Sequence, residues 1–178
     1  LVTLAWTQPQ RWALAANGAR LPWPERDRPR NELIAATIAR KVVAPDQLRE
    51  RLVEFWHDHF NVATQAGPQA SASLPDHDAR IRTHAFGNFA ALVEAMAGSP
   101  AMLTYLNNRS SRAGAANENF ARELLELHTL GAQAYHAEAR SWRDVPTENG
   151  MPTGYFDGDV WEAARAFTGW TVHAGQRL

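Results

Sequence analysis

Two acids, an arginine and a histidine lie close together in one short stretch of the chain, and these side chains are well suited to chemistry. The stretch reads NENFARELLELHTLG, and its reactive members are Arg122, Glu123, Glu126 and His128. Carboxylates and imidazoles bind divalent metal ions and move protons, and a guanidinium neutralises a carboxylate or orients an anionic substrate. We therefore expect a catalytic or metal site here.

The stretch has the signals of one capped helix. Asn117 is a favourable N-cap residue, Glu118 places a negative charge in the first turn, and Gly131 follows the last apolar residue. At about 100° per residue, Glu123 and Glu126 share one face of this helix. On the same geometry His128 lies about 140° away from Glu123, so these two residues cannot chelate one ion from this helix alone.

Two interpretations of this helix remain open. In the first it is a surface helix whose acids pair with Arg122 at i,i+4 spacing, Glu118 on one side and Glu126 on the other. In the second both faces are buried, and the polar face lines an interior cavity. Carboxylates in such a cavity need a cation or an arginine as partner.

A second candidate ligand is His59, near the end of a helix that Asp46 is expected to begin. The apolar face of that helix carries Phe55, Trp56 and Phe60, and His59 falls on the same face. We therefore expect His59 to be buried. Burial disfavours a protonated imidazole and leaves a neutral ring suited to metal ligation, although a buried histidine can equally be a hydrogen-bonded core residue.

The surrounding elements are predicted to be helical throughout, because no strand-like alternation persists. We expect an all-α fold, a single irregular helical domain of about five to six helices packed around the central helix that carries Glu123. Residues 1–30 are expected to be an irregular N-terminal segment and residues 31–178 the helical domain. Helices are predicted over 31–43, 46–60, 76–96, 100–106, 117–130 and 157–168, with a mobile connection over 65–75 and an aromatic-rich cover over 132–158.

Composition excludes several classes of function. The chain has 178 residues, of which 45 % are hydrophobic, and a net charge of −1 with Lys41 as its only lysine. It therefore lacks the basic field that gathers nucleic acid, and no apolar run is long enough to span a membrane. It has no cysteine, which excludes disulfides, thiolate ligands and a cysteine nucleophile.

The stretch from Asn117 to Gly131 and four further motifs resemble those of a bacterial family catalogued as domain of unknown function 1800. The further motifs, in chain order, are FWHDHF at 55–60, HAFGNF at 84–89, SPAMLTYL at 99–106 and DVWEAARAFTGW at 159–170. The resemblance covers about residues 50–172 and implies an exported or periplasmic bacterial protein without a settled activity. It also implies genes often placed beside those of a sulfatase-like family, and hence a sulfatase-like partner protein.

The chain differs from the usual pattern of this family in two respects. The segment from Ala132 to Phe156 is longer than the connection usual in the family. Family members also continue past Gly169 and Trp170 into a second helical part, so residues 31–178 are expected to be the N-terminal part of a longer protein.

Two classes of function are compatible with these residues. In the first, His59, Glu123 and Glu126 hold a divalent metal (Zn, Mn or Fe) that activates a bound water for hydrolytic or redox chemistry. Glu123, Arg122 and His128 are then the catalytic candidates: Arg122 neutralises a carboxylate or orients an anionic substrate, and His128 acts beside the metal ligands or as an acid or base. In the second, the protein is a noncatalytic helical binding or scaffold module whose buried Glu, Arg and His network is structural.

Overall fold

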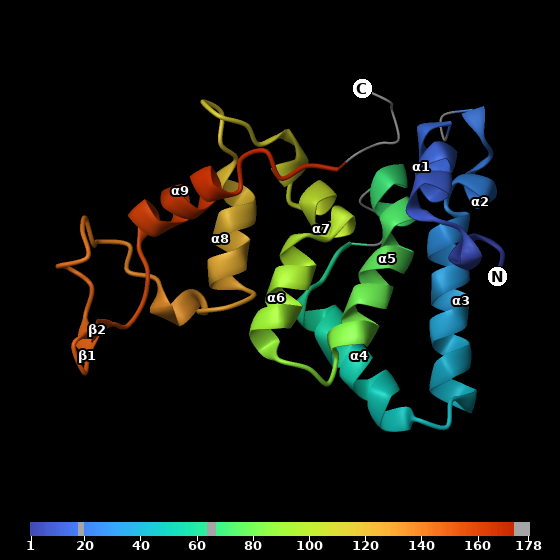
Figure 1. The fold of residues 1–178 in the computed structure, drawn as a ribbon, viewed down its shortest axis with the longest axis horizontal. Helices are drawn as coiled ribbons and strands as arrows, with labels where there is room; N and C mark the ends of the chain where they lie inside the picture. Colours follow the sequence, from blue (N-terminus) through green and yellow to red (C-terminus); the bar gives the residue numbers. More distant parts are fainter. Residues whose placement is uncertain (18–19, 64–66, 173–178) are drawn as a thin grey trace. The chain divides into compact units, whose positions relative to one another are not determined.

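Helices form most of the protein in a computed structural model that describes residues 1–17, 20–63 and 67–172 (Figure 1). The all-α prediction is confirmed. The two short strands within the described residues, β1 (Thr147–Glu148) and β2 (Met151–Pro152), pair antiparallel. The turn between them is Asn149–Gly150, both with positive φ, as a tight hairpin turn requires. Among the described helices, none has the length and apolar character needed to cross a membrane.

Where the sequence suggested one helical domain over 31–178, residue contacts group the described chain into two compact units. Unit 1 comprises Leu1–Tyr105 with Val172, and unit 2 comprises Leu106–Thr171. Each unit is described by itself below.

Unit 1 is built around one helix, α5, which contacts α1, α3, α4, α6 and α7. The bounds in chain order are η1 (Thr3–Ala5), α1 (Gln8–Ala16), α2 (Trp23–Arg26), α3 (Arg28–Val43), α4 (Gln47–His59), α5 (Pro68–His84), α6 (Phe89–Ala97) and α7 (Pro100–Tyr105). The first half of α5 carries small buried side chains from Ala70 to Ser73. Small side chains let neighbouring helices approach closely, so this helix can be surrounded on several sides.

Helices α3 and α4 form the expected helical hairpin. The side chain of Asp46 accepts a hydrogen bond from the backbone N of Arg49, which fixes the start of α4. Ala44, in extended conformation before Pro45, ends α3, as expected of a residue that precedes proline. The hairpin brings the last turns of α3 beside the first turns of α4.

The expectation of an irregular segment over residues 1–30 is wrong for most of that range. Helix α1 begins at a capping box, in which the backbone N and hydroxyl of Thr7 both donate to Oε1 of Gln10. Pro9 in the first turn costs no hydrogen bond, since the first four N–H groups of a helix have no partner within it. Pro9 therefore lies in the first turn of α1, although the composition of this segment suggested irregular structure.

The long helix expected over 76–96 is two helices, and it begins earlier than expected. Helix α5 already runs from Pro68 and contains Pro75, within a segment that we expected to be a mobile connection; residues 65 and 66 of that segment lie outside the described part. The break falls at Gly87 and Asn88, and the Asn88 side chain accepts from the backbone N of Ala90 and caps α6.

Unit 2 is organised by the packing of α8 on α9. Its elements are η3 (Asn108–Ser110), α8 (Glu118–Glu126), η4 (Ala132–Ala134), the β1–β2 hairpin and α9 (Asp157–Ala166). Buried Ala121, Tyr155, Val160 and Ala164 form a common apolar cluster. The ring of Phe120 meets that of Phe167 edge to face, with centroids 5.0 Å apart.

Helix α8 begins at Asn117 as expected but ends one turn early, at Glu126. The backbone N atoms of Leu130 and Gly131 both donate to the carbonyl O of Leu125 and close the helix. Gly131 has a φ of 92°, which favours glycine. His128 consequently lies in this closing turn and not on the regular helix.

Candidate functional site

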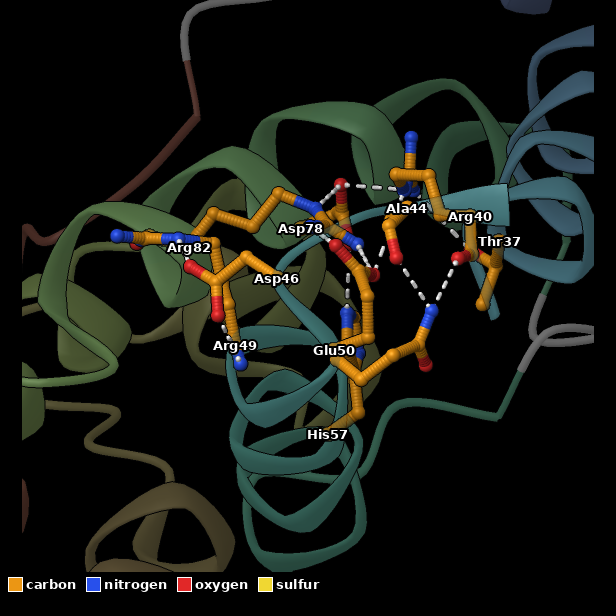
Figure 2. A network of polar contacts seen from close by, with 10 residues as sticks. Thr37, Arg40, Ala44, Asp46, Arg49, Glu50, His57, Asp78 and Arg82 are labelled. Atoms are coloured by element: carbon orange, nitrogen blue, oxygen red, sulfur yellow. Dashed lines mark hydrogen bonds and ion pairs between the residues drawn. The ribbon is translucent and has the colours of Figure 1, made fainter. Parts of the chain in front are cut away.

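A network of polar side chains joins three helices in unit 1 (Figure 2). Helix α4 contributes Glu50 and His57, two turns apart, and α5 contributes Asp78 and Arg82, one turn apart. Arg40 comes from the last turns of α3. These spacings place the two polar side chains of α4 on one face of that helix, and likewise the two of α5. The two faces can therefore meet, and Arg40 of α3 can join them.

Glu50 and Arg82 form the best-aligned ion pair of this network. Nη1 and Nη2 of Arg82 donate to the two carboxylate oxygens of Glu50, each at 2.9 Å, which is bidentate geometry. The side chain of Glu50 is only 7 % exposed. The hydrogen bonds from Arg82 outweigh the effect of burial and hold the pKa of Glu50 below its ordinary value. Glu50 is therefore ionised.

Asp78 receives three positive or polar partners. Nε of Arg82 donates to it at 2.9 Å, Nη2 of Arg40 lies 3.6 Å away, and Nε2 of His57 lies 3.0 Å from Oδ1. Burial alone would favour the neutral acid. The hydrogen bond with His57 and the charge of Arg82 outweigh that effect and lower the pKa of Asp78.

The ionised state of Asp78 fixes the tautomer of His57. A carboxylate can only accept hydrogen bonds, so Nε2 of His57 must carry the proton. In the neutral ring the lone pair is then on Nδ1. Among the described residues Nδ1 has no hydrogen-bond partner, which leaves it available to a bound molecule.

A second imidazole, that of His77, lies beside the first, with ring centroids 5.6 Å apart. Its Nε2 donates to the carbonyl O of Phe60 at 3.0 Å, and its Nδ1 accepts from the hydroxyl of Ser99 at 2.9 Å. Burial, reinforced by the neighbouring His57, lowers the pKa of His77 to about 3. With both nitrogens bonded and the ring neutral, His77 is a structural residue.

His57 lines a pocket of about 310 Å³ between α3, α4 and α5. Most of the pocket surface is apolar, although the apolar side chains are joined by a larger number of polar ones. The apolar members are Leu33, Ile34, Ile38, Val53, Val62 and Leu74. A concave apolar pocket with a few convergent polar groups is the usual form of a small-molecule site.

The structure places the predicted ligand His59 on α4 in unit 1. The ring is half-buried rather than fully buried, and it contacts the rings of Trp56, Phe60 and Phe89. The expected aromatic surroundings are therefore present. Glu123 and Glu126 lie on α8 in unit 2, so the metal site made of all three residues stays a prediction.

Within unit 2, Arg122 makes one of the two ion pairs expected of a surface helix and a second one that was not expected. Its Nε donates to Glu118 at 2.9 Å, as i,i+4 spacing predicts, but Nη2 donates to Asp157 at the start of α9 at 3.1 Å and not to Glu126. The hydroxyl of Tyr135 also donates to Asp157, at 2.8 Å. Arg122 thus holds α8 to α9.

Glu123 and Glu126 remain half-buried on α8, and neither carboxylate makes a hydrogen bond or ion pair to another described residue. Burial and the charge of Glu126 raise the pKa of Glu123. His128 is 5 % exposed, in the turn that closes α8. Within the described ranges, no three His, Asp or Glu side chains of either unit are grouped closely enough to hold a metal ion.

The sequence reasoning missed His57 and Asp78. His57 lies off the apolar face of its helix, the face that made His59 the candidate ligand. The signal was present in that position: Glu50 and His57 are seven residues apart, and Asp78 and Arg82 are four apart, so two adjacent helices each carry a polar stripe. What the sequence could not show is that the two stripes face each other.

Comparison with known proteins adds the family. A family model described as "Protein of unknown function (DUF1800)" matches residues 4–177. The chain belongs to the DUF1800 family. The match extends the resemblance seen in the motifs to nearly the whole DUF1800 chain, including the pocket of unit 1. No curated protein and no solved structure matches it.

Proposed function

We propose that this DUF1800 chain is an enzyme that binds a small molecule in the pocket of unit 1 and transfers a proton at His57. The observation that carries the proposal is the hydrogen bond between Nε2 of His57 and the buried, ionised Asp78, on the wall of a 310 Å³ pocket. A carboxylate behind an imidazole whose other nitrogen is free is the arrangement of a general base.

The chemistry follows from the charges of the network. Nδ1 of His57 takes a proton from a bound substrate or from a water beside it, and the ring becomes an imidazolium. Asp78 stabilises that cation and keeps the ring in place, while Arg82 and Arg40 keep Asp78 ionised throughout. The proton is returned from Nδ1 to the product, so the network ends as it began.

Chromogenic esters, amides and phosphate esters, assayed with matched variants, test this proposal. We expect turnover by the wild type, loss of turnover by at least about a hundredfold in His57→Gln, and a smaller loss in Asp78→Asn. His84→Gln is the matched control, since it removes a histidine of unit 1 that does not line the pocket. Equal turnover by wild type and His57→Gln would refute the assignment.

A second proposal retains the metal site predicted from the sequence. It is supported by the two unpaired, half-buried carboxylates on α8 and by the raised pKa of Glu123, because a bound cation would relieve their mutual repulsion. Glu123 and Glu126 are the proposed carboxylate ligands of Zn, Mn or Fe, with His59 as the third. The family resemblance further favours an exported bacterial protein with a sulfatase-like partner.

Elemental analysis of protein purified without chelator or metal affinity tests this second proposal. We expect stoichiometric metal in the wild type and its loss in Glu123→Gln. The variant His59→Gln then decides the third ligand: unchanged metal content would remove His59 from the site while leaving the carboxylates in it. Metal-free wild type after exposure to each ion would end the proposal.

A further inference from the structure

The charged groups on the wall of the unit 1 pocket balance one another. Three basic side chains line it (Arg30, Lys41 and Arg82) and so do three acidic ones (Glu50, Glu54 and Asp58). A site for a charged substrate instead presents an excess of the opposite sign. The wall offers no such excess.

Most of these charges are also already paired. Arg82 and Glu50 form the bidentate pair, and Nζ of Lys41 donates to Glu54. Arg30 lies 3.7 Å from Asp27, outside the pocket wall. Asp58 is exposed, where water solvates its carboxylate. A charged ligand at Arg82 or Glu50 would have to separate this largely buried pair, and a partner left buried and unpaired is costly.

The uncharged part of the wall consists of six apolar side chains with Thr37, Asn61 and the two histidines, and the pocket is of limited size. Side chains of α3 supply one side, with Ile34 and Ile38 a single turn apart and 44 % and 60 % exposed. A cavity of about 150 Å³ holds a benzene ring, so one of twice that volume holds roughly a dozen non-hydrogen atoms. Covering the two isoleucines would stabilise such a ligand through burial of apolar surface.

We infer that the substrate of this site is an uncharged, mostly apolar molecule of that size, with one polar group placed at Nδ1 of His57. The inference rests on the proposed function, since it takes His57 as the reacting group. It adds the class of the substrate: a neutral carbonyl compound or alcohol with an aromatic or short aliphatic body, rather than a carboxylate, phosphate or amine.

Alkylation of His57 by two matched bromoketones tests both statements in the full chain. In each reaction Nδ1 displaces bromide from the CH₂ group, forming an N–C bond while the C–Br bond breaks. One reagent is 4-methylphenacyl bromide, which is neutral, and the other is 4-carboxyphenacyl bromide, which is anionic but has the same ring and leaving group. Rates at His57 are followed by peptide mass spectrometry and divided by those of N-acetylhistidine with the same reagent.

We expect the neutral reagent to modify His57 about tenfold or more faster than N-acetylhistidine, and the anionic reagent to show no such gain. If neither reagent modifies His57 faster than N-acetylhistidine, the ring is not available and the proposed function fails. If the anionic reagent gains as much as the neutral one, His57 is reactive and only the inference about charge is overturned.

The variant Glu54→Gln checks the reason for the charge selectivity. It removes the partner of Lys41 and so frees a cation on the pocket wall. The anionic reagent should then gain severalfold in rate relative to the neutral reagent. An unchanged preference in Glu54→Gln would show that pairing on the wall does not exclude anions, and would overturn the inference.

Discussion

At the scale of single residues, two neighbouring histidines show how hydrogen-bond partners and burial decide whether an imidazole is reactive or structural. His57 and His77 have ring centroids 5.6 Å apart, yet His77 has both nitrogens hydrogen-bonded and His57 has one free. Burial lowers the pKa of His77 so far that it cannot serve as a base near neutral pH. The proposed proton transfer therefore belongs to His57.

His77 predicts a specific acid sensitivity. Its pKa is about 3 in the folded protein against an ordinary value of 6.5, so the unfolded chain binds the proton more readily. Stability is then present above pH 6.5 and is lost progressively as the pH falls from 6.5 toward 3. Urea unfolding followed by circular dichroism should show a loss of about 2 kcal/mol between pH 7 and pH 5 from this residue.

The control for that prediction is His77→Asn, which removes the titrating ring. The variant should be less stable at pH 7, but its free energy of unfolding should change less between pH 7 and pH 5 than that of the wild type. The pKa values of Glu50 and Asp78 are lowered, so their contributions are lost only in more acidic solution. Parallel pH profiles for the two proteins would contradict the prediction.

At the scale of elements, α4 and α5 are held together by charges as well as by apolar contacts. Arg82→Met should destabilise the protein by roughly 3 kcal/mol, because it leaves the buried carboxylate of Glu50 without its bidentate partner. The double variant Arg82→Met with Glu50→Leu should recover a large part of that loss, since no unpaired Glu50 charge remains. Chemical denaturation of the two single variants and the double variant measures the coupling.

This cycle also separates a structural network from a catalytic one. If the network only stabilised packing, the double variant would keep turnover as it recovers stability. The proposed mechanism instead predicts that turnover stays low, because Arg82 helps to keep Asp78 ionised behind His57. Recovery of both properties would show that the network stabilises packing and takes no part in the reaction.

In unit 2, Gly154 is required by the close approach of two chain segments. A Cβ atom there would lie 2.1 Å from the carbonyl O of Ala134 and 2.7 Å from Nε2 of His136. The backbone N of Tyr155 donates to the carbonyl O of Ala134, and that of His136 donates to the carbonyl O of Tyr155, so this approach is fixed and the strain cannot be relieved by a side-chain rotation. Gly154→Ala should cost about 2 kcal/mol or more in thermal or chemical unfolding.

Gly98→Ala is the matched control for the Gly154 variant. The nearest atom to its Cβ would be 3.7 Å away, an ordinary contact, and the backbone there does not have positive φ. Its effect should be within about 0.5 kcal/mol. Equal losses in the two variants would show that glycine flexibility, and not the close approach, decides the outcome.

Local signals in the sequence predicted most of the helices. The Asp46 and Asn117 caps gave the starts of α4 and α8, and the prolines and apolar spacing gave α3 and α7. The failures lie where tertiary packing overrides composition. Residues 65–75 are predicted to be a connection, yet Pro75 in this range is buried within α5. The small side chains of α5 allow other helices to pack around it, which makes this helix the centre of unit 1.

At the scale of the whole molecule, the packing of one helix on another explains why the site was harder to predict than the fold. Sequence patterns show which residues share a face of one helix, and they correctly grouped Glu123 with Glu126. They do not show which faces meet. His57 and Asp78 are 21 residues apart on different helices and come together only because α4 packs on α5.

All residues that line the pocket belong to unit 1, and this predicts where a ligand acts. Bound 4-methylacetophenone, the unreactive parent of the neutral reagent, should slow amide hydrogen exchange in α3, α4 and α5. At a concentration about 100 times Kd, amides of unit 1 that exchange by its global opening should slow by about a hundredfold, because the ligand stabilises only the folded unit.

Amides of α8 and α9 serve as the internal reference in the same experiment. Their exchange should be unchanged, since the ligand makes its contacts within unit 1 and stabilises the structure that those contacts require. Equal slowing in unit 2 would mean that both units open in one cooperative step, and slowing confined to α8 would place the binding site of the ketone in unit 2 and contradict the proposed pocket. Hydrogen exchange thus locates the ligand without knowledge of the natural substrate.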